Sequence, residues 1–154
     1  MQSALTISAS LPPATPEYIE SLNQLEAQIL TQEQQVLDVW HQIHGGIYSR
    51  TVVMPAGSVV MGALIKVPTT LIICGDASVG IGDMAFTRYQ GFHVLAGSSG
   101  RKQVFVVHED TVLTMQFRTD ATTVDEAERE FTDDFDRLQS RVSEAINHIN
   151  ITGE

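Results

Sequence analysis

Apolar residues near the N-terminus recur at intervals of three and four, whereas in the middle of the chain they form short runs or alternate with polar residues. The N-terminal series predicts an amphipathic helix, because residues three and four apart share one helical face. Thr15 suits the cap of that helix, Pro16 its first position, and Gly45–Gly46 its end. We predict a helix over residues 15–45, after a flexible arm over residues 1–14. Its apolar stripe comprises Leu22, Leu25, Ile29, Val36, Val39 and Ile43.

A second helical pattern occupies the C-terminal part of the chain. Thr123 and Glu126 have the spacing of a capping box, in which the threonine caps the helix and the glutamate reaches back. We predict a helix over residues 121–151, with acidic side chains such as Glu128 and Glu130 on its outer face. Its apolar stripe includes Phe131, Leu138, Val142 and Ile149.

Residues 46–120, between the two predicted helices, have the pattern of about eight short strands separated by glycines and turns. Many short strands at this spacing favour a sandwich or barrel over alternating strands and helices. We predict strands over residues 48–54, 58–65, 69–74, 77–81, 84–89, 92–95, 103–108 and 111–118.

Composition and charge bound the functions. Hydrophobic residues make up 43% of the chain and charged residues 18%, which is typical of a globular domain. The net charge is −10, and the first 49 residues contain no lysine or arginine, so general nucleic-acid binding is not expected. No apolar run approaches the ~20 residues of a membrane span, and the N-terminus lacks the pattern of a secretory signal.

A set of motifs in residues 46–125 resembles a small cupin-like family of bacteriophages and prophages. The motifs are Ile47–Thr51, Met54–Gly57, Gly62, Lys66, Gly75, Gly100, Lys102 and Glu109–Val112. The resemblance implies a mainly β fold, a cupin-like double-sheet barrel (jelly roll), here with long helices added at both ends. It also implies a location in the host cytoplasm or the virion.

In the wider cupin superfamily, three histidines and a carboxylate of two motifs bind a metal ion, a donor set that suits iron, manganese, nickel or zinc. In this sequence the corresponding positions hold Ala63, Ile65, Pro68 and Gln103. The resemblance therefore implies a protein with no metal, no other cofactor and no enzymatic activity. We expect Ala63 and Ile65 to fill the barrel interior with apolar side chains.

The remaining candidate residues each have a structural alternative. Tyr89, His93, Gln103 and His108 would suit a small ligand such as a sugar or nucleotide, or they are satisfied core and rim residues. His41 and His44 would lie one helical turn apart, as a metal pair or as cations at a helix C-terminus. The loop of Ser98, Ser99, Gly100, Arg101 and Lys102 offers backbone N–H groups and two cations to an anion, or simply connects strands.

Unpaired apolar stripes on two long helices would need a partner. We therefore expect a homo-oligomer, a dimer or higher, in which both stripes form the interface as a coiled coil. Our interpretation is a structural interaction module, associated with a virion and its other proteins. Two other functions stay open: a cupin that binds a small ligand, and an intracellular phage effector whose acidic helix binds a host protein.

Overall fold

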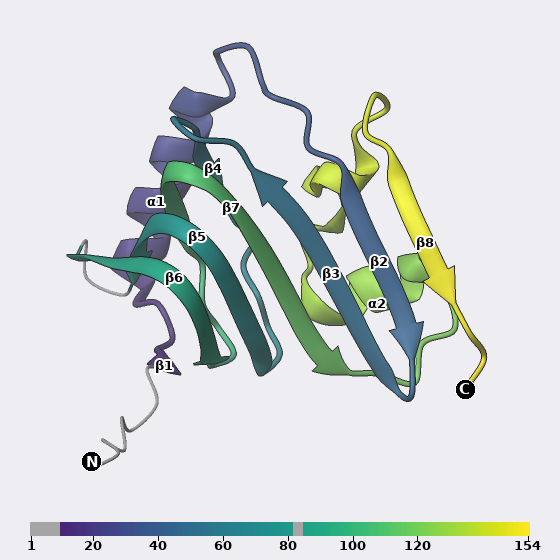
Figure 1. Ribbon diagram of the computed structural model, residues 1–154. Helices are drawn as coiled ribbons and strands as arrows, with labels where there is room; N and C mark the ends of the chain where they lie inside the picture. Colours follow the sequence, from purple (N-terminus) through teal and green to yellow (C-terminus); the bar gives the residue numbers. More distant parts are fainter. Residues whose placement is uncertain (1–9, 82–84) are drawn as a thin grey trace.

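The computed structural model describes residues 10–81 and 85–154, and it is mainly β (Figure 1). Seven strands follow one another in a single sheet in the order β1-β6-β5-β7-β3-β2-β8, and β4 pairs with β7 beside β3. The pairs β1–β6 and β2–β8 are parallel and the others are antiparallel. The strands are β1 (Ser10–Leu11), β2 (Val39–His44), β3 (Ile47–Met54), β4 (Val59–Met61), β5 (Thr69–Ile81), β6 (Ala85–Gly97), β7 (Val104–Arg118) and β8 (Asn147–Ile151).

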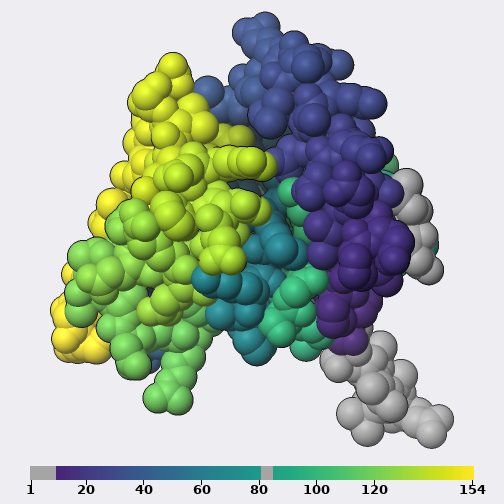
Figure 2. Space-filling model, turned by 180° about the vertical axis from the view of Figure 1, so that it is seen from behind, coloured from purple at the N-terminus to yellow at the C-terminus, as the bar shows by residue number. Residues whose placement is uncertain are grey.

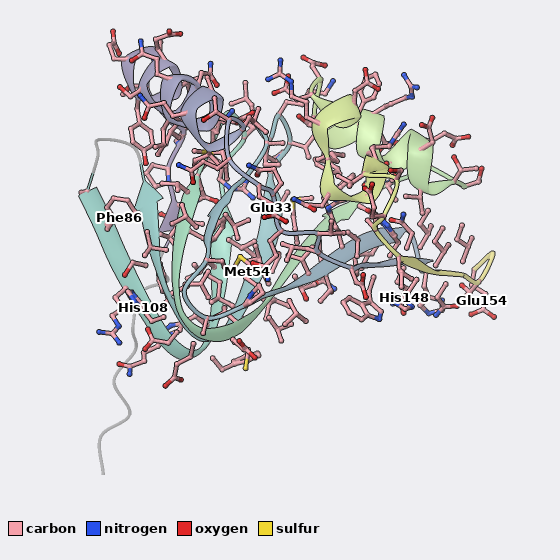
Figure 3. All side chains as sticks on the ribbon, turned by 90° about the horizontal axis from the view of Figure 1, so that it is seen from above. Glu33, Met54, Phe86, His108, His148 and Glu154 are labelled. Carbon is pink, nitrogen blue, oxygen red and sulfur yellow. The ribbon has the colours of Figure 1, made fainter. Side chains whose placement is uncertain are left out.

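The sheet bends into a trough, and the helical segments lie over its concave side (Figure 3). Period-two alternation places one set of side chains on that inner side; on β2, for example, Val39, His41 and Ile43 are buried and the residues between them are exposed. The core therefore lies between the concave face of the sheet and its helical covers. No helix in the described part of the chain is long and apolar enough to cross a membrane.

Three of the strands are longer than predicted, because three segments expected to separate strands lie within continuous strands. β5 runs through Gly75, β6 through Gln90–Gly91 and β7 through Glu109–Asp110. At Gly75 the neighbouring strand approaches so closely that a Cβ atom would lie 2.5 Å from Thr111 Oγ1. The same threonine oxygen accepts a hydrogen bond from the backbone N–H of Asp76 at 3.0 Å. The glycine thus marks an irregularity in the β5–β7 pairing, where the two strands approach closely, and not a loop.

The N-terminal helix begins where the sequence indicates and ends much earlier. α1 spans Pro16–Ile29, and the Thr15 side chain accepts a hydrogen bond from the N–H of Tyr18 at 3.2 Å. The prediction of a helix to residue 45 was wrong, since residues 39–44 are strand β2. Gly45 and Gly46, with φ of 60° and 74°, form the turn of the β2–β3 hairpin and do not end a helix. Of the predicted arm, residues 1–9 lie outside the described residues.

The C-terminal helix is likewise short. α2 spans Val124–Phe131; Thr123 caps it, and the Glu126 carboxylate accepts from the N–H of Thr122 at 3.1 Å. The predicted helix over residues 121–151 was wrong beyond Phe131, because Thr132 takes up an extended backbone and its side chain accepts from the N–H of Asp134. Two 3-10 turns follow, η1 (Phe135–Arg137) and η2 (Gln139–Arg141), and then β8.

The predicted helical interface consequently has no continuous stripe. Five of its residues are buried within the chain itself: Leu22, Val39, Ile43, Phe131 and Leu138. Leu25, Val36 and Ile149 are exposed, but they lie on a helix, in a connecting segment and on a strand; Ile29 and Val142 are half-buried. A coiled coil between two long helices is therefore not supported by the structure.

His41 joins the last strand to the interior. It lies on β2, where it does not form a helical pair with His44, and its side chain is 3% exposed. Its Nε2 lies 2.7 Å from Asn147 Oδ1 on β8, and its Nδ1 lies 2.7 Å from the Tyr48 hydroxyl. The amide oxygen only accepts, so Nε2 carries a proton and neutral Nδ1 accepts from the tyrosine. Burial lowers the pKa of His41 and raises the pKa of Tyr48 to about 12.

Because the folded state holds His41 neutral, acid should destabilise the protein. The unfolded histidine titrates near 6.5, so from that pH downward the unfolded chain binds a proton that the folded chain does not. We expect the free energy of unfolding, measured in urea, to fall between pH 7 and pH 5. A His41→Gln variant should show a shallower fall. Parallel curves for the two proteins would contradict this role of His41.

Candidate functional site

A cavity of about 400 Å³ lies between the concave face of the sheet and the segments that cover it. Its walls are mostly apolar: Val52, Val60, Ala63, Ile65 and Met115 on the sheet side, and Ile29, Leu37, Phe131 and Leu138 on the side of the covers. From behind, the molecule is hollowed between the N-terminal helix, in purple, and the C-terminal segment, in yellow-green (Figure 2). Ala63 and Ile65 pack against the core, and an open space remains beside them.

Ala63 and Ile65 line the cavity because the chain between β4 and β5 continues along the sheet without forming a regular strand. The N–H of Gly62 donates to the carbonyl of Gln103 at 2.9 Å, and the N–H of Ile65 to that of Arg101 at 2.8 Å. Of the other two positions where the resemblance implies metal ligands, Pro68 is exposed and Gln103 is buried, and neither lines the cavity. Of the four positions, Ala63 and Ile65 are therefore the two that line the cavity.

A buried carboxylate lies behind one wall of the cavity. Glu128, on α2, is 2% exposed and accepts hydrogen bonds from Arg50 Nη1 of β3 and Arg141 Nε of η2, both at 2.8 Å. The Arg50 guanidinium also lies 5.7 Å from the centre of the Phe131 ring. Two cations from distant segments thus neutralise one acid, which fixes α2 and η2 on the sheet. The prediction that Glu128 lies on the outer face of its helix was wrong.

A second ion pair holds the other cover. The Lys102 ammonium, with a side chain that is 3% exposed, donates to Glu26 Oε2 at 2.6 Å and to Asn23 Oδ1 at 2.9 Å on α1. Arg137 lies at the solvent side of the same group, 3.6 Å from Glu26, with its side chain 68% exposed. Glu26, Lys102 and Arg137 all line the cavity, so one part of its rim is charged.

The cations of the predicted anion loop are directed into the protein. Arg101 Nη1 donates to the Ser98 carbonyl at 2.9 Å and Nη2 donates to Thr69 Oγ1. Burial lowers the pKa of Arg101 to about 10, which leaves it charged at neutral pH. Together with the Lys102 ion pair, these contacts use both cations of residues 98–102 to hold neighbouring segments of the fold.

The four predicted ligand-binding residues are not brought together. Tyr89 and His93 are neighbours on β6, with ring centres 5.3 Å apart, and His93 Nε2 lies 2.8 Å from the carbonyl of Gln90. His108 lies on β7, outside the trough, with Nε2 2.8 Å from Ser78 Oγ (Figure 3). None of these residues, nor Gln103, lines the cavity described above.

Arg50 and Glu128 are the residues that sequence reasoning missed. Arg50 alternates with Tyr48 and Val52, so a cation stands at an inward position of an apolar strand. Glu128 lies three residues before Phe131 and four after Val124, on the apolar face of α2. A charged residue in an apolar series indicates a buried ion pair, because charged side chains are almost never fully buried without a partner. Arg50 and Glu128 both gave this signal.

No protein-family model matches the sequence, and no curated protein matches it either. Several solved structures resemble the fold, with TM-scores below 0.5. The cupin domain of Cnp3 from Schizosaccharomyces pombe is 18% identical with a TM-score of 0.44, over 66% of this chain and 72% of that one. A cupin-2 domain containing protein from Shewanella frigidimarina is 10% identical with a TM-score of 0.41, over 65% and 98%. DMSP lyase DddQ from Ruegeria pomeroyi is 16% identical with a TM-score of 0.42, over 79% and 83%.

Two of these three neighbours are thus cupin-domain proteins, and the third is an enzyme. In residues 10–81 and 85–154, no three histidine, cysteine, aspartate or glutamate side chains are grouped so that they would hold a metal ion.

The buried ion network makes a specific prediction about stability. Removing Arg50 alone, as in Arg50→Leu, leaves Glu128 buried with only one cation, and losing a partner of a buried pair typically costs about 3–5 kcal/mol. The double variant Arg50→Leu/Glu128→Leu removes the unpaired acid as well. We expect it to be more stable than Arg50→Leu in urea unfolding. Equal stabilities would mean that Arg50 acts through packing and not through its charge.

Proposed function

We propose that this chain is a non-catalytic, cupin-like binding protein whose interior cavity holds a small, mostly apolar molecule. The observation that carries the proposal is the cavity of about 400 Å³ on the concave face of the sheet, in the lower part of the size range of small-molecule sites. A void of this size lined by aliphatic side chains forgoes packing energy, and a ligand with an apolar body would recover it.

The lining selects the chemical class. Sugar hydroxyls need many polar partners, whereas the floor of the cavity offers side chains such as Val60, Ile65 and Met115. Most of the polar lining groups lie on the cover side, among them the amides of Gln34 and Gln139 and the exposed guanidinium of Arg137. We infer an amphipathic acid, with its apolar chain against the sheet and its carboxylate near Arg137. Decanoate is a suitable probe.

Decanoate should bind to the purified full chain in isothermal titration calorimetry. Ala63→Phe places a ring in the cavity and should abolish the signal, whereas Ala56→Phe, at an exposed site before β4, should leave it unchanged. Arg137→Gln should weaken binding about two- to fivefold, as expected for an exposed ion pair. Absence of binding at millimolar decanoate, or equal binding by the Ala63→Phe variant, would refute the proposal.

The absence of catalysis is part of the proposal and rests on the sequence resemblance. Ala63, Ile65 and Pro68 have no side chain that binds a metal ion, and the amide of Gln103 is a poor replacement for histidine. Elemental analysis of the purified protein should therefore find no stoichiometric iron, manganese, nickel or zinc. About one such ion per chain would contradict this.

A second candidate function is the structural interaction module in a virion that the resemblance to phage and prophage proteins suggests. The convex face of the sheet favours it, because exposed apolar residues such as Trp40, Phe92 and Val94 lie there. The effector alternative has less support. Asp125 of α2 is paired with Arg129 at 2.8 Å and with Arg141 at 2.6 Å, so part of the acidic charge of this helix is neutralised within the chain.

A further inference from the structure

The convex face of the sheet carries three rows of side chains that run across its strands and contain no charged residue. Each row is a series of cross-strand partners, so its members are direct neighbours on the surface. The first row is His148, Trp40, Thr51, Thr114, Ile72 and Val94; the second is Val53, Val112, Cys74 and Phe92; the third is Asn150, Gln42, Ser49, Gln116, Thr70 and Ala96. We call these three rows the outer face.

Large apolar groups of the outer face are open to solvent. Phe92 is 68% exposed, Val94 54% and Trp40 40%, and Cys74 is exposed between Phe92 and Val112. The Trp40 ring stacks on His148 at 4.7 Å with an angle of 9° between the ring planes, which forms a flat aromatic platform. A shallow hollow of about 400 Å³ adjoins this platform. Contiguous exposed apolar surface of this kind marks a site of association.

The size of the outer face suits a protein partner. A strand spacing of about 4.8 Å and a two-residue rise of about 6.8 Å give about 30 Å² of flat sheet for each outward side chain. Three rows of four to six positions thus offer on the order of 500 Å² of flat sheet. The side chains that project from the sheet add further accessible surface. A standard interface uses about 800 Å² of accessible surface per partner, so the outer face and its margin are sufficient.

We propose that a second copy of this chain covers the outer face, in a sheet-on-sheet dimer. The chain has a net charge of −10, so two copies repel one another least when the surfaces in contact carry no charge, as in these three rows. The outer face offers a different protein no charged group for complementary recognition. Two twisted sheets can pack face to face with a dry interface about 10 Å thick.

This inference extends the second candidate function, the oligomeric module, and replaces the predicted helical interface with the outer face. It is tested by sedimentation velocity on the purified full chain at about 1–100 μM. We expect a species of twice the 16.9 kDa chain mass. Sodium chloride at 1 M should tighten the dimer. Salt screens the repulsion between two acidic chains, whereas the apolar contact between them does not depend on charge.

Variants separate the outer face from other surfaces. Phe92→Asp/Val94→Asp places acids of both copies in the interface and should weaken the dimer at least about 100-fold. Leu25→Asp/Val36→Asp is the matched control, since it adds two acids at exposed apolar positions near α1 and should leave the dimer intact. Circular dichroism reports whether each variant keeps its β structure.

The alkylation rate of Cys74 gives a second measure of dimer formation, and it needs no variant. The thiol should react with a maleimide several-fold more slowly at 100 μM protein than at 1 μM, because dimers cover it. A monomeric parent chain at 100 μM, a dimer unaffected by Phe92→Asp/Val94→Asp, or a reaction rate independent of protein concentration would each overturn the inference. Mass spectrometry of purified phage particles tests the virion role independently of the dimer. The chain could be found in particles although it is a monomer, or be missing from particles although it is a dimer.

Discussion

The pairing of buried Glu128 with Arg50 and Arg141 is the contact on which the rest of the molecule depends. The three side chains come from α2, β3 and η2, and their ion pairs attach the C-terminal segment to the concave face of the sheet. Without that segment, Tyr48 and Phe117 would lose the Phe131 ring that packs against both. Such a pair adds little net stability over apolar residues of the same volume, but it excludes arrangements in which a charge is left alone. Its role is to specify one position for the cover.

The same principle explains why the interior is not completely filled. One cover is fixed by the Glu128 network and the other by Lys102 and Glu26. The charged groups of each pair must meet at hydrogen-bond distance, and this requirement fixes the position of each cover. The apolar side chains of the cover and the sheet can then approach only as closely as that position allows. The sheet is bent between these two fixed points, and a cavity remains where the aliphatic side chains of the two layers do not meet.

The sequence was informative where a signal is local. Both helix starts follow from Thr15 and Thr123, and period-two alternation indicates strands in the central region, although it placed breaks inside β5, β6 and β7. The ends of the helices were wrong because Val36, Val39 and Ile43 fit helical spacing, while Val39, His41 and Ile43 equally fit a strand. Which period prevails depends on β3, since the Gly45–Gly46 turn brings its edge to β2. This competition between local and tertiary preference is not visible in a single segment.

The candidate site was less predictable than the fold. Ala63 and Ile65 were expected in the interior and do line it, but an empty volume depends on the curvature of the sheet, which no short motif encodes. Arg50 and Glu128 are 78 residues apart, so their pairing has no local signature. Residues 98–102 look like an anion loop in sequence because the partners of Arg101 and Lys102, among them Thr69 and Glu26, belong to other elements.

The position of β8 has a consequence for the order in which the sheet assembles. Its partner β2 lies 108 residues earlier in the chain, whereas β2 and β3 are joined by a two-residue turn and β5 is followed directly by its partner β6. Closing a long loop has a greater entropic cost than closing a short one, so hairpins precede distant pairings. During folding, β2 would therefore stand as an open edge with its N–H and C=O groups unpaired, a template for pairing with another chain. The last strand thus completes the fold and also ends the period in which this edge is open to aggregation.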